Sequence, residues 1–194
     1  MTMKKLLIII LLFNTMVTFA QKSDSVAAKA SKTKNVDGTL MFSAKDVIGN
    51  ISASPQLTTL VKLIDSAGLA DNLKTGTIAV FAPTNQAFDK LVPGTLDTLL
   101  KPNHKNDLVV LVNNHIIQGK LTSKDIDSQI KAGNGQAVFT TLSGGTLTAR
   151  INENRNIVLT DDNGGQSIVT RLDIEQSNGI LFIVSAVLQP KSKQ

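Results

Sequence analysis

The spacing of apolar residues changes about halfway along this chain of 194 residues. In the first half, apolar side chains recur at i, i+3, i+4 and i+7, which places them on one face of an α-helix. The clearest run is Leu57, Leu60, Val61 and Ile64, and the same spacing returns at Leu108, Leu111, Val112 and His115. Shorter helices are expected after Thr84, around 95–100 and from Ser123 to Gly133. The first half is therefore predicted to be mainly helical.

The second half follows the two-residue period of β-strands, in which successive side chains point to opposite faces. Turn signals such as Gly144-Gly145 and Asn163-Gly164 separate the apolar segments. Strands are predicted at 136–141, 146–152, 157–160, 167–174 and 180–188. The last segment is apolar on both faces, which is typical of a central strand. Together the two halves predict an α+β fold, with a helical layer packed on a small antiparallel β-wedge.

Residues 77–88, TIAVFAPTNQAF, predict a strand that turns sharply into a short helix. Nearly every position before Pro83 is apolar, so this strand is expected to be buried on both faces. Pro83 ends the strand because proline cannot donate to a ladder. Thr84 is placed to cap the following helix, and Pro83 and Phe88 have the spacing of a hydrophobic staple.

The same twelve residues closely resemble the first signature segment of the fasciclin (FAS1) domain family, TVFAPTNxAF. Residues 111–121, LVNNHIIQGKL, resemble the central segment of that family, and residues 178–190, NGILFIVSAVLQP, resemble its closing segment. The three segments stand in the family order and frame about 150 residues of the chain. The chain therefore resembles a single-domain member of the family, and the resemblance implies the same α+β fold.

The two ends of the chain have a different composition from the middle. Residues 1–20 combine Lys4 and Lys5, an apolar run, and small residues before the predicted cleavage site, which is typical of a secretion signal. The apolar run is shorter than the roughly 20 residues that a membrane span needs. Residues 21–37 are predicted to be a flexible leader, 38–190 the fasciclin-like domain and 191–194 a tail. The protein is expected to be secreted or periplasmic, with no transmembrane segment after processing.

The net charge of the whole chain does not describe the domain. The formal charge is +5, but residues 40–190 hold 12 Lys and Arg against 13 Asp and Glu. The basic excess therefore comes from the two ends, so a nucleic-acid partner is not expected. The chain has no Trp and no Tyr, and this also disfavours stacking platforms for sugars or single-stranded nucleic acids.

Residues that carry catalytic or metal chemistry are scarce. The chain has no cysteine and two histidines, and it contains no recognisable nucleophile, phosphate-binding or zinc-binding motif. Residues 161–165, DDNGG, are interpreted as a hairpin turn and not as a calcium loop. Asp125 and Asp127 would point to different faces of a helix, so they are not expected to act as an acid–base pair. No catalytic residue, cofactor or metal site is predicted.

His115 and Asn114 are interaction candidates because of the family resemblance alone. They occupy the family's Tyr-His doublet, a region implicated in adhesion, with Asn114 in place of the tyrosine. From the residues themselves, His115 is interpreted as a core histidine whose ring nitrogens are bonded within the protein.

Asp173 and Ile174 are the second pair of candidates. The resemblance implies a contact role, because adhesive members of the family carry an Asp-Ile pair a few residues before the closing segment. The alternative interpretation is an ordinary pair of strand residues.

The sequence therefore predicts a secreted, non-catalytic adhesion or interaction module. The expected partner is a cell-surface or matrix protein or a polysaccharide. The alternative is an extracellular or periplasmic carrier that holds a small ligand in a cleft between the helices and the wedge.

Overall fold

The structure, a computed structural model, describes residues 31–191. The predicted signal peptide, the first part of the leader and the last three residues lie outside the described residues. The helices are α1 (Val47–Ile51), α2 (Thr58–Ala67), α3 (Asn85–Phe88), α4 (Thr95–Leu99), α5 (Lys105–Asn113) and α6 (Ser123–Ala132), with 3-10 turns at Asn72–Lys74 and Pro102–His104. The strands are β1 (Thr33–Val36), β2 (Thr39–Phe42), β3 (Ile78–Pro83), β4 (Ile116–Gln118), β5 (Ala137–Thr140), β6 (Thr146–Ile151), β7 (Ile157–Thr160), β8 (Gln166–Gln176) and β9 (Gly179–Val184).

Strands β3 to β9 form one sheet of seven strands, in the order β4-β3-β9-β8-β7-β6-β5. The β3–β9 pair is parallel, and all other neighbours in this sheet are antiparallel. The two edges approach each other, because Ile117 bridges Thr141 and the Leu142 N–H donates to the Ile116 carbonyl over 2.8 Å. The sheet is therefore almost closed on itself.

The prediction of a small antiparallel wedge is wrong in its size and its strand directions. Both β3 and β9 were predicted to be buried on both faces, and they are: all six residues of each strand are buried. Such strands pair most readily with each other in the middle of a sheet. This pairing brings β3 and β4 of the helical half into the sheet, so the sheet is large and mixed.

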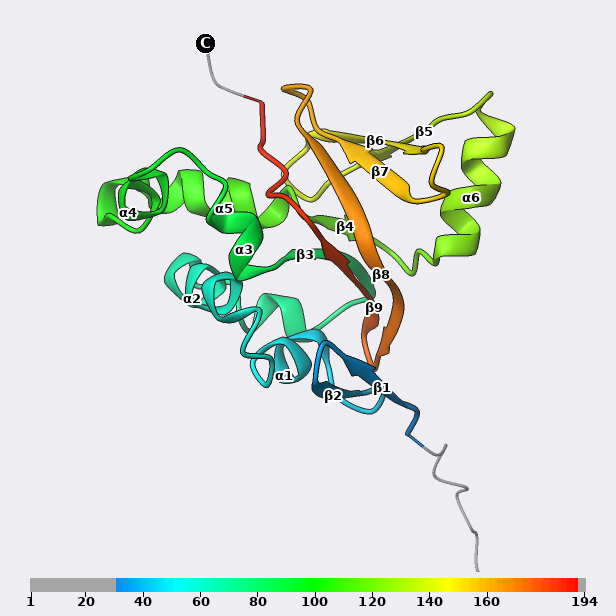
Figure 1. Cartoon of the computed structure of the whole chain (residues 1–194). Coiled ribbons are helices and arrows are strands. Elements are labelled where there is room, and N and C mark those ends of the chain that lie inside the picture. Colours follow the sequence, from blue (N-terminus) through cyan, green and yellow to red (C-terminus); the bar gives the residue numbers. More distant parts are fainter. Residues whose placement is uncertain (1–30, 192–194) are drawn as a thin grey trace, which may run out of the picture. The chain divides into compact units, whose positions relative to one another are not determined.

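The β3–β9 pair separates two hydrophobic cores. On one face, Val80 and Leu181 pack in a cluster with residues of α1, α2 and α5. On the other face, Phe81 and Phe182 stack with ring centroids 5.0 Å apart, in a cluster with residues of α6 and β5–β8. Figure 1 shows helices α1 to α5 on one side of β3 and β9, and strands β5 to β7 with α6 on the other.

The start of β9 depends on a glycine. Gly179 pairs with Ile78 and has a φ of 152°. A Cβ atom at this position would lie 1.8 Å from the Ile78 carbonyl oxygen. Only glycine allows the two backbones to approach this closely.

The predicted flexible leader is wrong for residues 33–37. Residues 33–36 form β1, which pairs antiparallel with β2 from Thr33–Phe42 to Val36–Thr39. Val36 is buried in the helical core. Arg171 of β8 forms an ion pair with Asp37, and Lys34 donates to the Leu172 carbonyl. Because this segment is mainly polar, its sequence did not predict the burial of Val36 or the two contacts with β8.

The turn into α3 is formed as predicted. The Thr84 hydroxyl accepts from the Ala87 N–H over 3.3 Å, and Phe88 is buried. The Asn85 amide adds contacts that the sequence did not predict. It accepts from the Thr59 N–H and donates to the Pro55 carbonyl, and thereby attaches the start of α2 to this turn.

Phe88→Ala should lower the free energy of unfolding by about 3–5 kcal/mol, because it leaves a cavity in the helical core. Thr84→Ala removes one helix cap and should cost about 1 kcal/mol. Urea melts of both variants measure the two effects. Near-neutral effects at both positions would contradict a structural role for this turn.

Candidate functional site: the closing segment and the Asp173 turn

Residues 185–190 form a closing segment that leaves the sheet after β9. The sequence predicted that the strand would continue to Leu188, but it ends at Val184. Beyond this point, side chains from distant elements bond to the backbone. Ser167, for example, accepts from the Ala186 N–H over 2.9 Å and donates to the Ala186 carbonyl over 2.8 Å. The irregular segment is thus held by side chains where the β-ladder ends.

His115 binds the closing segment through one ring nitrogen. It is buried directly after α5, with Nδ1 2.9 Å from the Leu111 carbonyl oxygen. Its Nε2 accepts from the Leu188 N–H over 2.9 Å. The Leu188 donor requires a lone pair on Nε2, so the proton is on Nδ1 and the ring is neutral. The prediction of a core histidine with both nitrogens bonded is confirmed.

Asn114 joins the same closing segment to the two edges of the sheet. Its amide nitrogen donates to the Leu188 carbonyl over 3.1 Å. Its amide oxygen accepts from the hydroxyls of Thr141 and Ser143, over 3.3 and 3.0 Å. Asn114 is buried, so it lies at the closure of the sheet and not on the surface.

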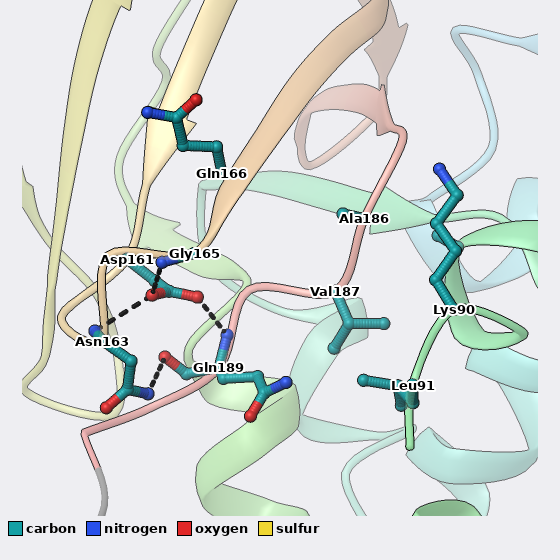
Figure 2. A pocket seen from close by; sticks show the side chains of 10 residues that line it. Lys90, Leu91, Asp161, Asn163, Gly165, Gln166, Ala186, Val187 and Gln189 are labelled. Atoms are coloured by element: carbon teal, nitrogen blue, oxygen red, sulfur yellow. Dashed lines mark hydrogen bonds between the residues drawn. The ribbon is translucent and has the colours of Figure 1, made fainter. Parts of the chain in front are cut away.

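Asp161 is a buried carboxylate at the turn between β7 and β8. One carboxylate oxygen accepts from the backbone N–H groups of Asn163 and Gly165, over 3.0 and 2.8 Å. The other accepts from the Gln189 N–H over 2.8 Å (Figure 2). The Asn163 amide donates to the Pro190 carbonyl over 2.8 Å. The predicted hairpin turn at 161–165 is present, and it also anchors the closing segment.

A small cavity lies beside the closing segment, between residues 87–91 of the helical half and the β7–β8 turn. Figure 2 shows Lys90 and Leu91 on one side of it, with Asp161 and Asn163 on the other. The cavity volume is about 260 Å³. An adjoining apolar hollow of about 180 Å³ shares Leu91 and Val187 with it. Ligand pockets are usually about 300–1,000 Å³, so this cavity is small even for a compact ligand.

Burial also favours the neutral form of His115. Removal of the ring from water lowers the pKa of His115 from 6.5 to about 4, against the opposing influence of the hydrogen bond with Leu111 and the charge of Asp161. The histidine is therefore an acceptor over the physiological range, which is the state that the Leu188 N–H requires.

Asp173 lies in a distorted part of β8. The β8–β9 register shifts between Arg171 and Ile174, and Asp173 has a φ of 51°. Its carboxylate accepts from the Ser123 N–H over 2.8 Å and from the Ser123 hydroxyl. Asp173 therefore satisfies the first N–H of α6, next to the capping box that Thr122 and Asp125 form.

The structure does not bring the four candidate residues together as one exposed site. Asp173 is half-buried, whereas Ile174, Asn114 and His115 are buried. A buried side chain cannot touch a partner while the fold is intact. The Asp-Asp-Asn-Gly turn indicated that Asp161 would accept hydrogen bonds within the turn. Its bond to the Gln189 N–H, 28 residues away, could not be predicted from the sequence.

The groups considered for acid–base or metal chemistry have structural partners. Asp125 belongs to the capping box of α6, and Asp127 pairs with Lys131 one turn later. Within residues 31–191, no three His, Asp or Glu side chains are grouped closely enough to hold a metal ion. No helix in that range is long and apolar enough to cross a membrane.

Comparisons with known proteins agree with this architecture. The family model described as the Fasciclin domain matches residues 55–190. The chain is 27% identical to Protein sll1483 of Synechocystis over 93% of this chain and 96% of that protein. It is 29% identical to the cell surface glycolipoprotein MPB83 of Mycobacterium bovis, over 86% of this chain and 71% of that protein.

The fold has also been solved in another protein. A FAS1 domain pair from the insect cell adhesion molecule Fasciclin I superposes with a TM-score of 0.65 and 19% identity. The match covers 74% of this chain and 50% of that chain. The chain belongs to the Fasciclin domain family, as its three sequence segments indicated.

The burial of His115 predicts how stability depends on pH. Because the pKa of His115 is about 4 in the folded state and about 6.5 in the unfolded state, the unfolded chain binds the extra proton between these values. The free energy of unfolding should therefore fall as pH decreases from about 6.5 towards 4, by a loss on the order of 3 kcal/mol from this group. Urea melts across this range measure the slope.

His115→Gln should be less stable at neutral pH and should lose most of that slope. His104→Gln is the matched control, because it removes the other histidine, which is part-exposed beside Asp107. An unchanged slope in His115→Gln would show that the buried ring does not cause it.

Asp173→Ala should cost about 1–2 kcal/mol, because it removes the acceptor for Ser123 and places alanine in the left-handed region. Asp173→Gly separates the two causes, since glycine adopts this backbone conformation freely but still lacks the carboxylate. Thermal melts of both variants decide between them. A loss below about 0.5 kcal/mol in Asp173→Ala, as for an ordinary surface residue, would show that Asp173 is free for other contacts.

Proposed function

We propose that this protein is an exported, non-catalytic interaction module that attaches to a cell surface, a matrix protein or an extracellular polysaccharide. The observation that carries the proposal is the use of the buried polar groups. Every buried side-chain nitrogen and oxygen in the described part of the chain has a hydrogen-bond partner. His115 and Asp161, the residues best suited to acid–base chemistry, are bonded to the closing segment. Because the buried polar groups are bonded within the protein, we place binding on its outer surface.

The relatives support an extracellular role. The mycobacterial relative is described as a cell surface glycolipoprotein, and the solved structure comes from a cell adhesion molecule. The basic and apolar pattern of residues 1–20 supports export, either to the periplasm or out of the cell.

A small-ligand carrier is the second candidate, because a cavity does lie between the helical half and the sheet. Its volume of about 260 Å³ is below the usual range for ligand pockets. Lys90 Nζ, at the rim, donates to the Ser185 carbonyl over 2.7 Å. A carrier would release a stoichiometric small molecule in native mass spectrometry of the purified protein.

The proposed function is tested by incubating the purified chain with whole cells of the source organism, immobilised matrix proteins and insoluble polysaccharides. We expect saturable retention on at least one of these surfaces, and none for the heat-unfolded protein. Absence of retention on all three, together with a stoichiometric bound small molecule, would contradict attachment and favour the carrier.

A further inference from the structure

The outer face of strands β5 to β8 carries threonines in register. The cross-strand partners Val138–Thr148, Thr148–Thr160 and Thr160–Gln166 form one row that crosses all four strands. A parallel row contains Arg150, Val158 and Ile168. We call these two rows the threonine face.

The threonine face is partly open to solvent: its outer members are exposed, whereas Thr148, Val158 and Thr160 are half-buried. Val138 is 59% exposed and Ile168 is 38% exposed, although β-branched apolar residues are usually buried. Helix α6 does not cover this face, because its buried residues Ile126 and Ile130 pack with Phe139 and Leu147 on the opposite side of the same strands. Figure 1 shows these four strands, in yellow to orange, beside α6.

Charge is sparse in these two rows, although the Asp162 carboxylate lies at their edge, where it accepts from the N–H and the hydroxyl of Thr146. Arg150 is their one charged member, and its guanidinium donates to the Gln136 side chain at the edge of β5. Because the single charge in the rows is already bonded within the protein, they match an uncharged partner better than a charged one, which would lose its water without gaining an opposite charge.

The remaining chemistry of the face is that of hydroxyls beside methyl groups. Within residues 31–191, no hydrogen bond occupies the hydroxyls of Thr148 and Thr160. Each can donate one hydrogen bond and accept others. The methyl groups and the flanking valines supply apolar contact. A neutral polymer with hydroxyl groups and apolar C–H surfaces has the complementary chemistry.

The size of the face separates a polymer from a folded protein partner. Four strands spaced by about 4.8 Å, with at most two residues of these rows on each, give roughly 250 Å². A stable protein–protein interface buries about 800 Å² on each partner. The threonine face is too small for that, and it lacks the Trp, Tyr and Arg anchors of tight interfaces. A long repeating partner compensates for weak contacts by binding many copies.

We propose that the threonine face binds a neutral, hydroxyl-rich extracellular polysaccharide. This inference rests on the proposed function and names the partner class. Because the face has no aromatic platform, hydrogen bonds of the threonine hydroxyls replace stacking. Binding should therefore be weak for each domain and insensitive to salt.

The test measures depletion of the full chain by amorphous cellulose and by curdlan, two insoluble neutral glucans, with alginate beads as an acidic polymer. Attachment to whole cells is measured in parallel. We expect depletion by a neutral glucan that persists at about 0.5 M salt, a concentration at which interactions between surface charges are strongly screened. We expect little depletion by alginate.

The deciding variant is Thr148→Glu with Thr160→Lys. These positions lie directly opposite each other, so the new charges pair across the strands and the sheet tolerates them. Glucan binding should fall by about tenfold or more, with an unchanged melting temperature. The matched control places the same two charges on exposed threonines elsewhere, Thr75→Glu with Thr98→Lys, and should bind normally. Thr148→Val with Thr160→Val should also lose binding, because it removes only the hydroxyls.

Four results would overturn the proposal. Unchanged glucan binding in Thr148→Glu with Thr160→Lys, or in the double valine variant, would exclude the hydroxyl rows as the contact. Whole-cell attachment without any glucan binding would contradict this inference but leave the proposed function intact. A dimer of the full chain that the charged variant dissociates would assign the face to self-association. If the unmodified chain shows neither cell attachment nor glucan binding, the proposed function itself would also be contradicted.

Discussion

The parallel pairing of β3 with β9 joins the helical half of the chain to the strand-rich half. All twelve residues of the two strands are buried, so each strand must be covered on both faces. The helices α1, α2 and α5 cover one face, and strands β5 to β8 with α6 complete the other. The stack of Phe81 on Phe182 and the close approach at Gly179 fix the register between them. The two halves of the sequence can fold as one domain because this pair belongs to both cores.

The central position of β9 creates a problem for the chain that follows it. The segment at 185–190 leaves the sheet in a partly buried place, where its backbone groups need partners other than a neighbouring strand. Asn114, His115 and Asp161 supply these partners. From the sequence, Asn114 and His115 were interaction candidates and Asp161 was part of a hairpin turn. Here they stabilise the closing segment, and this is why we place binding on the exterior of the sheet.

Much of the fold follows from local patterns in the sequence. The doubly apolar runs of β3 and β9, the cap at Thr84 and the core position of His115 were all predictable, because each depends on nearby residues or on periodicity. Long-range facts were not predictable. The sequence does not state that β3 pairs with β9, that Val36 enters the helical core, or that Asp173 bonds to Ser123 across 50 residues. The threonine face was likewise hidden, since its rows exist only once the register of four strands is known.

The closing segment is a fixed part of the fold, because His115 and Asp161 are bonded to its backbone. Amide hydrogen exchange at Leu188 and Gln189 tests this most directly, because these N–H groups donate to the two buried side chains. We expect exchange as slow as that of β9, with opening free energies close to that of global unfolding, on the order of 5–15 kcal/mol. Rapid exchange at both amides, while β9 stays protected, would contradict it: the segment would then open in the native state and leave His115 and Asp161 free to bind or react.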